Sequence, residues 1–173
     1  MNQHQEDLLV KKAQTGDREA LGLLWDQVTP KLFGYLVNTT HDKTLAEDLL
    51  QGTWLKAIEA LPNFKPRGIA ISAWLFAIAR NECRLHWRKS GRETAFDSSL
   101  HDVPAENNNQ TEHTILVEQV LNKLSDEDRE LIRLRYIADL PINDIAKVLN
   151  INFVAVRVRL HRALARARTA IKS

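Results

Sequence analysis

The sequence predicts an all-α protein made of two small helical domains that are joined by a flexible acidic linker. Apolar residues make up 44% of the 173-residue chain, which excludes a chain that is disordered throughout. Only 6 glycines and 5 prolines occur, and apolar residues recur every three or four positions over long stretches, as in amphipathic helices. This length suits one sizeable domain or two small ones, and the distribution of charge favours two.

The net charge of +2 is unevenly distributed along the chain. Residues 1–90 hold 12 basic and 10 acidic side chains, residues 91–113 hold 1 and 5, and residues 114–173 hold 11 and 7. The acidic middle segment is polar and ends in AENNNQTEH, which is typical of a linker. We therefore predict a first domain over 1–90, a linker over 91–113 and a second domain over 114–173. Basic charges on one face of either domain would indicate a polyanionic partner.

The composition also restricts where the protein works. No apolar run approaches the roughly 18 residues that cross a bilayer, so we expect no membrane insertion. The first residues, MNQHQEDLL, are polar and acidic, unlike a secretory signal. The single cysteine, Cys83, has no partner for an internal disulfide. A cytoplasmic protein in a reducing compartment is therefore expected.

Residue patterns typical of catalysis are missing from the sequence. It has no glycine-rich phosphate loop and no serine or cysteine nucleophile with an evident motif partner. Cys83 and His86 lie three positions apart on a predicted helix and could hold a metal ion, but no second pair of ligands is near in sequence. We therefore predict no catalytic residue, no metal and no cofactor, and a protein that is not an enzyme.

Two helices are predicted at the start of the chain. The first covers residues 6–15, and Gly16 ends it. Asp17 caps the second, which covers residues 17–38 and should kink or break because of Pro30. Two aromatic side chains of the second helix are predicted to lie in the core, with DNA contact as the alternative: Trp25 and Phe33.

A third helix is predicted over residues 44–61, with two different faces. One side is apolar and is expected to face the core: Ala46, Leu50, Trp54, Ala57 and Leu61. The other side holds polar or small residues and one leucine: Asp48, Gln51, Gly52, Leu55, Lys56 and Glu59. A single exposed leucine needs no explanation by itself. Beside Asp48 and Gln51, however, Leu55 makes a protein-docking face an equal alternative.

Residues 62–71 form a predicted loop, and a fourth helix follows over residues 72–88 with Ser72 as its cap. One side of this helix is polar and basic: Arg80, Asn81, Arg84, Arg88 and Lys89. Cationic groups next to aromatic rings suit single-stranded nucleic acid, because they neutralise phosphates while each stacked base contributes roughly 1–3 kcal/mol. The alternative is an ordinary amphipathic helix with tryptophans in the core. Trp74 fits that alternative better, whereas Trp87 fits either.

Residues 124–170 are predicted to form a helix, a short second helix, a tight turn and a long basic helix. Ser125, Pro141 and Asn152 are suited to the starts of these three helices. Asp144 is the last acidic residue, and only basic charges follow it: Lys147, Arg157, Arg159, Arg162, Arg166, Arg168 and Lys172. A basic helix after a short helix and a turn is how a helix-turn-helix enters a DNA major groove. A solvated face of a helical bundle is the alternative.

Four segments of the chain carry a resemblance to a known family. They are AEDLLQGTWLKAIEALPNF (46–64), AWLFAIARN (73–81), LSDEDRELIRLRYIADLPINDIAKVLNI (124–151) and VRVRLHRALARAR (156–168). The first two resemble region 2, and the last two region 4, of extracytoplasmic-function (ECF) sigma factors in the bacterial sigma-70 family. The resemblance covers nearly the whole chain apart from the linker. It implies an alternative sigma factor that binds core RNA polymerase, directs it to promoters through −10 and −35 elements and helps to melt the duplex.

The resemblance also assigns residues to partners. Docking on the clamp helices of the largest polymerase subunit is implied for Asp48, Gln51, Leu55 and Lys56. Contact with the −10 element and the opened single strand is implied for Lys65, Arg67, Arg80, Asn81, Arg84, Trp87 and Arg88. Contact with the −35 element is implied for Asn152, Phe153, Ala155, Arg157, Val158, Arg159 and Arg162. The family further implies contact with the polymerase flap, an anti-sigma factor as a partner, and a location in the bacterial cytoplasm with the nucleoid.

The chain departs from the family pattern at several positions. Gly52 stands where an acidic residue is common after the glutamine of that helix. Asn150 replaces a turn glycine, and asparagine tolerates a left-handed backbone. Ala155 and Val158 replace small hydroxyl residues, and with Val154 they make the outward face of the last helix apolar. We expect base reading there to rely on thymine methyl groups and DNA shape, with Arg157, Arg159 and Arg162 on phosphates.

Two other classes of function are open from the sequence. A regulator that binds duplex DNA without polymerase would need neither the docking face of residues 44–61 nor the basic, aromatic helix of residues 72–88. A helical adaptor that acts only through protein contacts would not need the basic C-terminal helix. Tight binding to promoter duplex in the absence of polymerase would favour the regulator.

Overall fold

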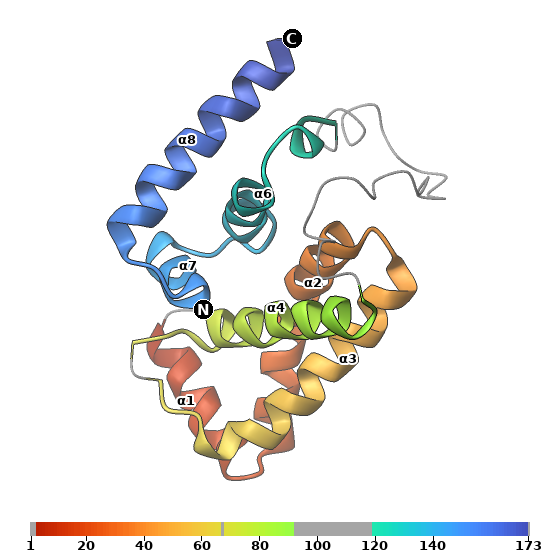
Figure 1. Ribbon diagram of the computed structural model, residues 1–173. Coiled ribbons are helices and arrows are strands. Elements are labelled where there is room, and N and C mark those ends of the chain that lie inside the picture. The colour runs from red at the N-terminus through yellow and green to blue at the C-terminus, as the bar shows by residue number, and fades with distance from the viewer. Residues whose placement is uncertain (1–2, 67, 92–118, 173) are drawn as a thin grey trace.

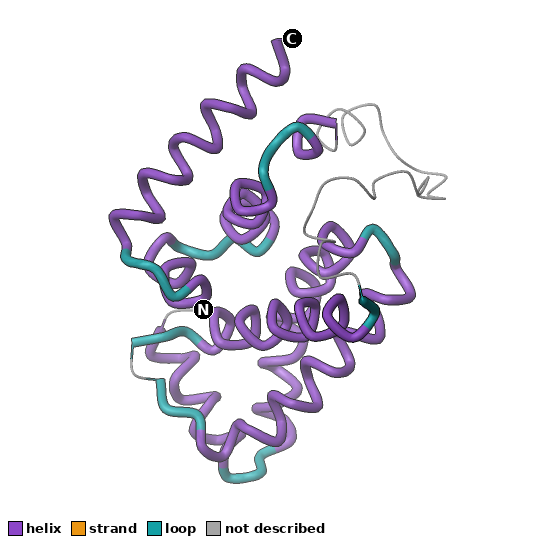
Figure 2. Tube along the Cα trace, viewed as in Figure 1, coloured by secondary structure: helices purple, strands orange, loops and turns teal. Residues whose placement is uncertain are grey.

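All regular elements in the described part of the chain are helical (Figure 2), which confirms the predicted all-α fold. The computed structural model describes residues 3–66, 68–91 and 119–172, so most of the predicted linker, residues 92–113, lies outside it. The elements are α1 (Gln3–Gln14), α2 (Arg18–Thr40), α3 (Lys43–Ala60), the 3₁₀ turn η1 (Leu61–Asn63), α4 (Ile71–Lys89), α6 (Asp126–Ile132), the π-helical turn η3 (Arg133–Ile137), α7 (Ile142–Leu149) and α8 (Phe153–Lys172).

Helices α1 to α4 pack into one group, and α6 to α8 into a second (Figure 1). Helix α4 crosses the middle of the molecule, with α1 and α3 on one side of it and the second group on the other. The first group is centred on α2, whose Leu32 and Leu36 are fully buried. Trp54 of α3 is also buried, and its indole N–H donates to Thr29 Oγ1 at 3.1 Å. Trp25 was predicted to lie in the core but lies at the surface. Its ring stacks on that of Trp54, with the ring centroids 4.5 Å apart.

Helix α2 begins and continues for reasons that are visible in its sequence. The carboxylate of Asp17 accepts a hydrogen bond from the Ala20 N–H at 3.1 Å, as predicted for its cap. Gly16 precedes it with a φ of 90°, a conformation that side chains disfavour. The helix then runs through Pro30 to Thr40 without a break, so the tertiary contacts on its buried side outweigh the one hydrogen bond that proline removes.

The N-terminus of helix α4 is capped by a side chain of another helix. The sequence-based prediction that Ser72 is its cap is wrong. Its first residue is Ile71, and the preceding Ala70 has no capping side chain. The Ile71 N–H donates instead to Glu6 Oε1 of α1 at 2.7 Å, in a buried position. Burial, opposed in part by this hydrogen bond, raises the pKa of Glu6 above its ordinary value. A carboxylate 65 residues away therefore satisfies the start of α4.

Substituting Glu6 separates the hydrogen bond from the charge. Glu6→Gln keeps an acceptor for the Ile71 N–H and removes the buried charge, so the free energy of unfolding at neutral pH is expected to stay level or rise slightly. Glu6→Ala leaves that N–H unsatisfied and is expected to cost about 1–3 kcal/mol. The pKa of Glu6 is raised in the folded chain, so the protonated side chain is favoured by folding. Its contribution to the free energy of unfolding is therefore present in acid and is lost as pH rises above about 4.5.

The advantage of the glutamine variant over the wild type should therefore be larger at neutral pH than near pH 4.5. Urea unfolding of the wild type and both variants at the two pH values measures this difference. A glutamine variant as unstable as the alanine variant would contradict the capping role of Glu6.

The second group contains the predicted helix–turn–helix, and its turns follow the sequence signals. Ser125 caps α6 by accepting from the Asp128 N–H at 3.3 Å. Asn150 ends α7 in a left-handed conformation with a φ of 54°, as expected for an asparagine in the place of glycine. Asn152 Oδ1 then accepts from the Ala155 N–H at 2.7 Å at the start of α8. Helix α8 packs on the rest of the second group through three buried residues: Val156, Leu160 and Ala163.

The two groups share one apolar cluster where α2 and α4 meet η3 and α7. Phe76 of α4 packs edge-on against Tyr35 of α2, with ring centroids 5.4 Å apart. Phe76 also lines a small cavity whose opposite wall is formed by Ala138, Leu140 and Pro141 of the second group. The core is thus continuous between the groups.

Candidate nucleic-acid interface

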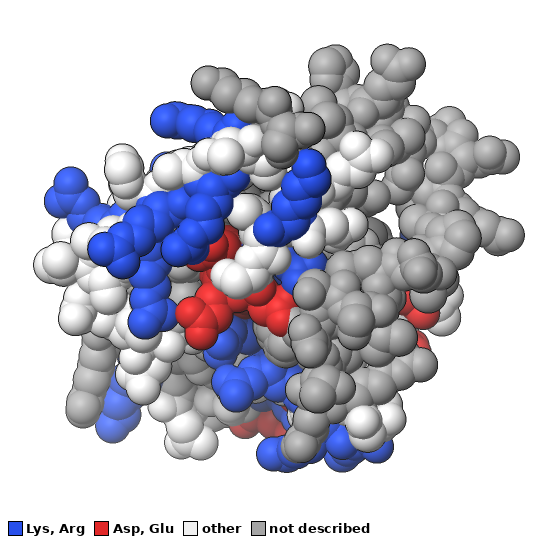
Figure 3. All heavy atoms as spheres, turned by 45° about the horizontal axis from the view of Figure 1, so that its top comes forward, with Lys and Arg blue, Asp and Glu red and all other residues white. Residues whose placement is uncertain are grey.

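Helix α8 presents the predicted −35 residues on its outer side. Val154 and Val158 are exposed to 65% and 42%, and Arg157 and Arg162 are also exposed, whereas Ala155 is half-buried. Phe153 lies at the first turn, with the Arg157 guanidinium 5.8 Å from its ring centroid. In Figure 3 a group of Lys and Arg side chains lies at the upper left, and further ones lie near the centre and towards the bottom of the view. The outward face therefore combines apolar side chains with guanidinium groups, as predicted.

The basic charge of α8 is partly balanced by the acidic start of α6, which the sequence reasoning missed. Arg159 pairs with Glu127 at 3.9 Å, and Arg166 pairs with the buried Asp128. Figure 3 shows a small acidic group next to the basic side chains. Among the described residues, Arg157 has no acidic group within ion-pair distance. Arg157 is thus available to a phosphate, while Arg159 and Arg166 also orient α8 on α6.

The predicted −10 residues of α4 lie around an open hollow of about 680 Å³. Its lining combines basic, amide and aromatic groups: Lys56, Asn81, Glu82, Arg84, Leu85, Trp87 and Arg88. Trp87 is half-buried, so part of its ring is accessible for stacking, whereas Trp74 packs on Phe64 with centroids 4.6 Å apart. Lys65 is exposed on the preceding loop, and Arg67 lies outside the described residues. Four predicted residues, Asn81, Arg84, Trp87 and Arg88, are thus brought together here.

Arg80 differs from the other predicted −10 residues. Its side chain is only 21% exposed and turns towards the second group, where Nε lies 3.3 Å from Glu130 Oε1 of α6. Arg80 and Arg84 also line a second cavity of about 470 Å³, between α4 and the second group. Its other walls come from α6, the end of α7, the turn that follows it, and α8: Asp126, Glu127, Glu130, Leu131, Leu149, Ile151 and Arg159. In this conformation Arg80 forms an ion pair with a carboxylate of its own chain.

The predicted docking face of α3 is exposed. Leu55 is 64% exposed, and Asp48, Gln51 and Lys56 lie at the surface as well. Ile58, one turn further along α3, is 43% exposed and extends the apolar part of this face, which the sequence reasoning missed. A signal was present, since Ile58 follows Leu55 at helical spacing.

The surroundings of Gly52 contain a carboxylate from the neighbouring helix. A Cβ at Gly52 would lie 3.5 Å from Glu82 Oε2 of α4. The same carboxylate forms an ion pair with Lys56. Negative charge is therefore present beside Gly52 although residue 52 has no side chain.

The described residues contain no group of three or more side chains suited to hold a metal ion. Cys83 of the Cys83–His86 pair is buried, and burial, followed by the charge of Glu130, raises the pKa of its thiol to about 12. A thiol with so high a pKa is poorly suited to bind a metal as a thiolate. Among the described residues, no helix has the length and apolar character needed to cross a bilayer.

Comparison with known proteins finds one family over most of the chain. Residues 24–93 match the family model for Sigma-70 region 2, and residues 114–166 match that for Sigma-70 region 4. The chain is 32% identical to the RNA polymerase sigma-H factor of Pseudomonas aeruginosa, over 94% of this chain and 92% of that protein. It is 29% identical to the ECF RNA polymerase sigma factor SigD of Mycobacterium tuberculosis, over 95% and 83%.

Two solved structures are similar along nearly the whole chain. The first is CnrH in complex with the cytosolic domain of CnrY, with a TM-score of 0.74, 25% identity, and coverage of 96% of this chain and 97% of that one. The second is the sigma factor RpoE in complex with the anti-sigma factor NepR from Bartonella quintana, with a TM-score of 0.69, 28% identity, and coverage of 88% and 96%.

Proposed function

This chain belongs to the ECF group of the sigma-70 family, and we propose how its parts share the work of an alternative sigma factor. An alternative sigma factor binds core RNA polymerase, directs it to promoters through −10 and −35 elements and helps to melt the duplex. Its polymerase performs the chemistry, so the chain itself acts as a DNA-binding regulatory subunit without catalytic residues. We assign residues 1–90 to polymerase and the −10 element, residues 114–173 to the −35 element, and residues 91–113 to the linker.

The −10 surface is proposed to be the hollow on α4, with Lys65 and Arg67 on the loop that precedes it. Arg84 and Arg88 would neutralise phosphates of the opened strand, Asn81 would hydrogen-bond to a base, and Trp87 would stack on one. The observation that supports this assignment is the gathering of these four side chains around one open hollow. Arg80 would join them once it is released from Glu130.

The −35 surface is proposed to be the outer side of the first turns of α8. Asn152, by capping α8, would hold its positively polarised start at the DNA backbone. Phe153, Ala155 and Val158 would contact thymine methyl groups and the walls of the major groove, while Arg157, Arg159 and Arg162 would contact phosphates. The exposure of both the valines and the arginines on this side supports that division.

Polymerase binding is proposed for the exposed face of α3, through Asp48, Gln51, Leu55 and Lys56. The second group would contact the flap. An anti-sigma factor is a proposed further partner, since the similar RpoE structure contains one, bound to that protein. The protein would act in the bacterial cytoplasm, at the nucleoid.

Run-off transcription tests the proposed function. Purified core RNA polymerase, with and without this chain, would transcribe a pool of templates with randomised −35 and −10 segments. We expect transcripts that depend on the added chain and share both elements upstream of their start. Binding to promoter duplex without polymerase, combined with no chain-dependent transcript, would favour a stand-alone DNA-binding regulator instead.

The role of Arg157 leads to a prediction about salt. Arg157→Ala is expected to weaken holoenzyme binding to −35 duplexes of every sequence by a similar factor, because the guanidinium contacts phosphate. The slope of log affinity against log salt concentration should become shallower by about 1. Arg168→Ala, near the far end of α8, is the matched control and should change neither quantity. A loss confined to one base pair would contradict phosphate binding and indicate direct base reading.

A further inference from the structure

The loop that precedes α4 is fastened at its start by a side chain of α1. This loop comprises residues 64–70 and carries the exposed Lys65. The side-chain amide of Gln14, the last residue of α1, donates hydrogen bonds to the carbonyl oxygens of Leu61 at 2.9 Å and Phe64 at 2.6 Å. Carbonyl groups at the end of a helical segment have few partners within it. Gln14 thus ties the beginning of the loop to a helix 47 and 50 residues earlier in the chain.

The end of the same loop is fastened by a second side chain of α1. Glu6 Oε1 accepts a hydrogen bond from the Ile71 N–H at 2.7 Å, and this contact is buried. In Figure 1 the yellow segment between α3 and α4 passes beside α1. Glu6 and Gln14 are eight residues apart, which corresponds to about 12 Å along the helix. These two side chains are therefore the anchors of the loop, one at each end.

The conformation within the loop is shaped by a local turn. Gly68 has a φ of 70°, which glycine adopts readily, and its N–H donates to the Pro66 carbonyl at 2.9 Å. A turn of this kind fixes the shape of a few residues, but not their place relative to α4. A loop that is held before a ligand binds loses less conformational entropy on binding. The two anchors on α1 therefore determine where the loop presents Lys65.

The loop and the hollow on α4 are separated along that helix. Ile71 begins α4, and Asn81, the first α4 residue that lines the hollow, lies ten residues later. Ten residues correspond to about 15 Å along a helix. Stacked nucleotides repeat about every 3.4 Å, so roughly four nucleotides span this distance. A single strand that contacts both places would be read at two sets of bases, and their spacing is constant only if the loop is held.

Helix α1 contains none of the residues that are assigned to polymerase or DNA, and it precedes residues 24–93, which match the model for Sigma-70 region 2. We propose that Gln14 and Glu6 are positioning residues for promoter recognition, which hold the loop at α4 so that its groups reach bases of the opened −10 strand. This proposal rests on the proposed assignment of the loop and α4 to the −10 element.

Two substitutions remove one anchor each. Gln14→Met keeps the length of the side chain, but the new side chain cannot donate to the carbonyls of Leu61 and Phe64. Glu6→Ala removes the acceptor of the Ile71 N–H. Glu6→Gln retains an acceptor and is the conservative variant. Circular dichroism verifies that each variant is folded.

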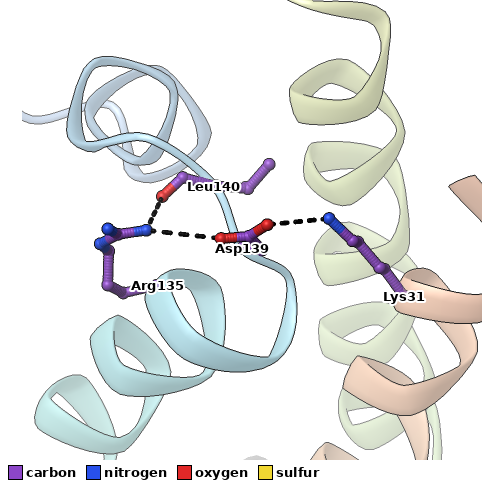
Figure 4. A network of polar contacts seen from close by, with 4 residues as sticks. All are labelled: Lys31, Arg135, Asp139 and Leu140. Atoms are coloured by element: carbon purple, nitrogen blue, oxygen red, sulfur yellow. Dashed lines mark hydrogen bonds and ion pairs between the residues drawn. The ribbon is translucent and has the colours of Figure 1, made fainter. Parts of the chain in front are cut away.

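Lys31→Met is the matched control for the loss of a long-range polar contact. Lys31 of α2 pairs with Asp139 at 2.9 Å, next to Arg135 and the Leu140 carbonyl (Figure 4). The two partners are 108 residues apart in the chain, and neither belongs to the loop or to α1. The substitution also introduces the same side chain as Gln14→Met does.

Limited digestion with trypsin measures how firmly the loop is held in the chain alone. Trypsin cleaves after Arg67, and mass spectrometry quantifies this product relative to cleavage within α4. We expect cleavage after Arg67 to be at least about tenfold faster in Gln14→Met and Glu6→Ala than in the wild type. The conservative variant and the control should match the wild type. A cleavage rate that is unchanged in both Gln14→Met and Glu6→Ala would overturn the anchoring.

Transcription by core polymerase from templates with randomised −10 and −35 segments measures the effect on recognition. Asn81→Ala marks the bases that are read at the hollow. Gln14→Met and Glu6→Ala should lower the preference by at least about fivefold at other −10 bases, roughly four nucleotides away, and leave the preference for the −35 element unchanged. A merely structural role would reduce the amount of transcript and leave every base preference as in the wild type. That result would overturn the proposal, and so would a loss at the same bases as in Asn81→Ala.

Failure of the proposed function has a different outcome. In that case the wild type itself gives no chain-dependent transcript, and the role of the anchors in recognition falls with it. The trypsin experiment still decides whether α1 holds the loop. Faster cleavage after Arg67 together with an unchanged −10 preference would overturn the positioning role while leaving the function as a sigma factor intact.

Discussion

Replacing Leu55 with aspartate is expected to reduce binding to core RNA polymerase by about 30-fold or more and to abolish chain-dependent transcription. Leu55 is 64% exposed at the centre of the proposed docking face, with Ile58 beside it. A buried apolar anchor at an interface is commonly worth about 2 kcal/mol or more, and a carboxylate in its place adds a desolvation cost. Because the side chain makes few contacts within the chain, the melting temperature should not change.

Leu8→Asp is the control for this experiment. Leu8 of α1 is 52% exposed, so the substitution places the same charge on a similarly exposed apolar position outside the proposed face. Polymerase affinity is measured by fluorescence anisotropy and stability by circular dichroism for both variants. Equal loss of affinity in the two variants would indicate a general effect of charge and would contradict the docking role of Leu55.

Substituting Phe76 with alanine is expected to destabilise the chain by about 3–5 kcal/mol, the usual cost of truncating a buried phenylalanine. Phe76 is 1% exposed, packs against Tyr35 and borders Ala138 and Leu140 of the second group. Because it lies in the apolar cluster that both groups share, its loss should lower protection against hydrogen exchange in α6 to α8 as well as in α1 to α4. The shared apolar cluster is the physical reason for this coupling.

Hydrogen exchange followed by mass spectrometry resolves the two groups, and urea unfolding measures the free energy. Tryptophan fluorescence alone would not suffice, because all four tryptophans lie in the first 90 residues. Ile171→Ala, at an exposed position of α8, should have little effect. Loss of protection confined to α1 to α4 would show that the shared cluster does not couple the groups.

Local signals in the sequence predicted the helices and most of their ends. Asp17, Ser125 and Asn152 cap helices as expected, and Asn150 adopts the left-handed conformation expected of it. These features depend on residues within three or four positions of one another, so a single stretch of sequence contains the whole cause. The same holds for the exposed face of α3, where Leu55 stands out against polar neighbours.

Features that depend on distant residues could not be predicted in this way. The cap of α4 comes from Glu6 rather than from Ser72, because the fold brings a carboxylate of α1 to the Ile71 N–H. Trp25 lies at the surface and stacks on the buried Trp54, which belongs to another helix. Arg80 belongs by sequence to the basic side of α4, but Glu130 holds it at the contact between the two groups.

The charge balance of α8 shows a similar limit. Sequence order suggested that its arginines have no acidic partners, since Asp144 is the last acidic residue. In the fold, the start of α6 lies beside α8 and supplies Glu127 and Asp128. Charge counted along the chain therefore overestimated the positive potential of α8. The three-dimensional arrangement was needed to show that Arg157 has no acidic partner in the described part of the protein.

The buried thiol of Cys83 can report how often the folded structure opens. It lies on α4 close enough to Glu130 and Arg133 of the second group for their charges to affect its pKa, which is raised to about 12. A disulfide reagent needs an accessible thiolate, so Cys83 in the folded chain should react extremely slowly. Each reaction event would then mark a moment at which the structure around Cys83 has opened, and the labelling rate would measure the frequency of those openings without an engineered cysteine.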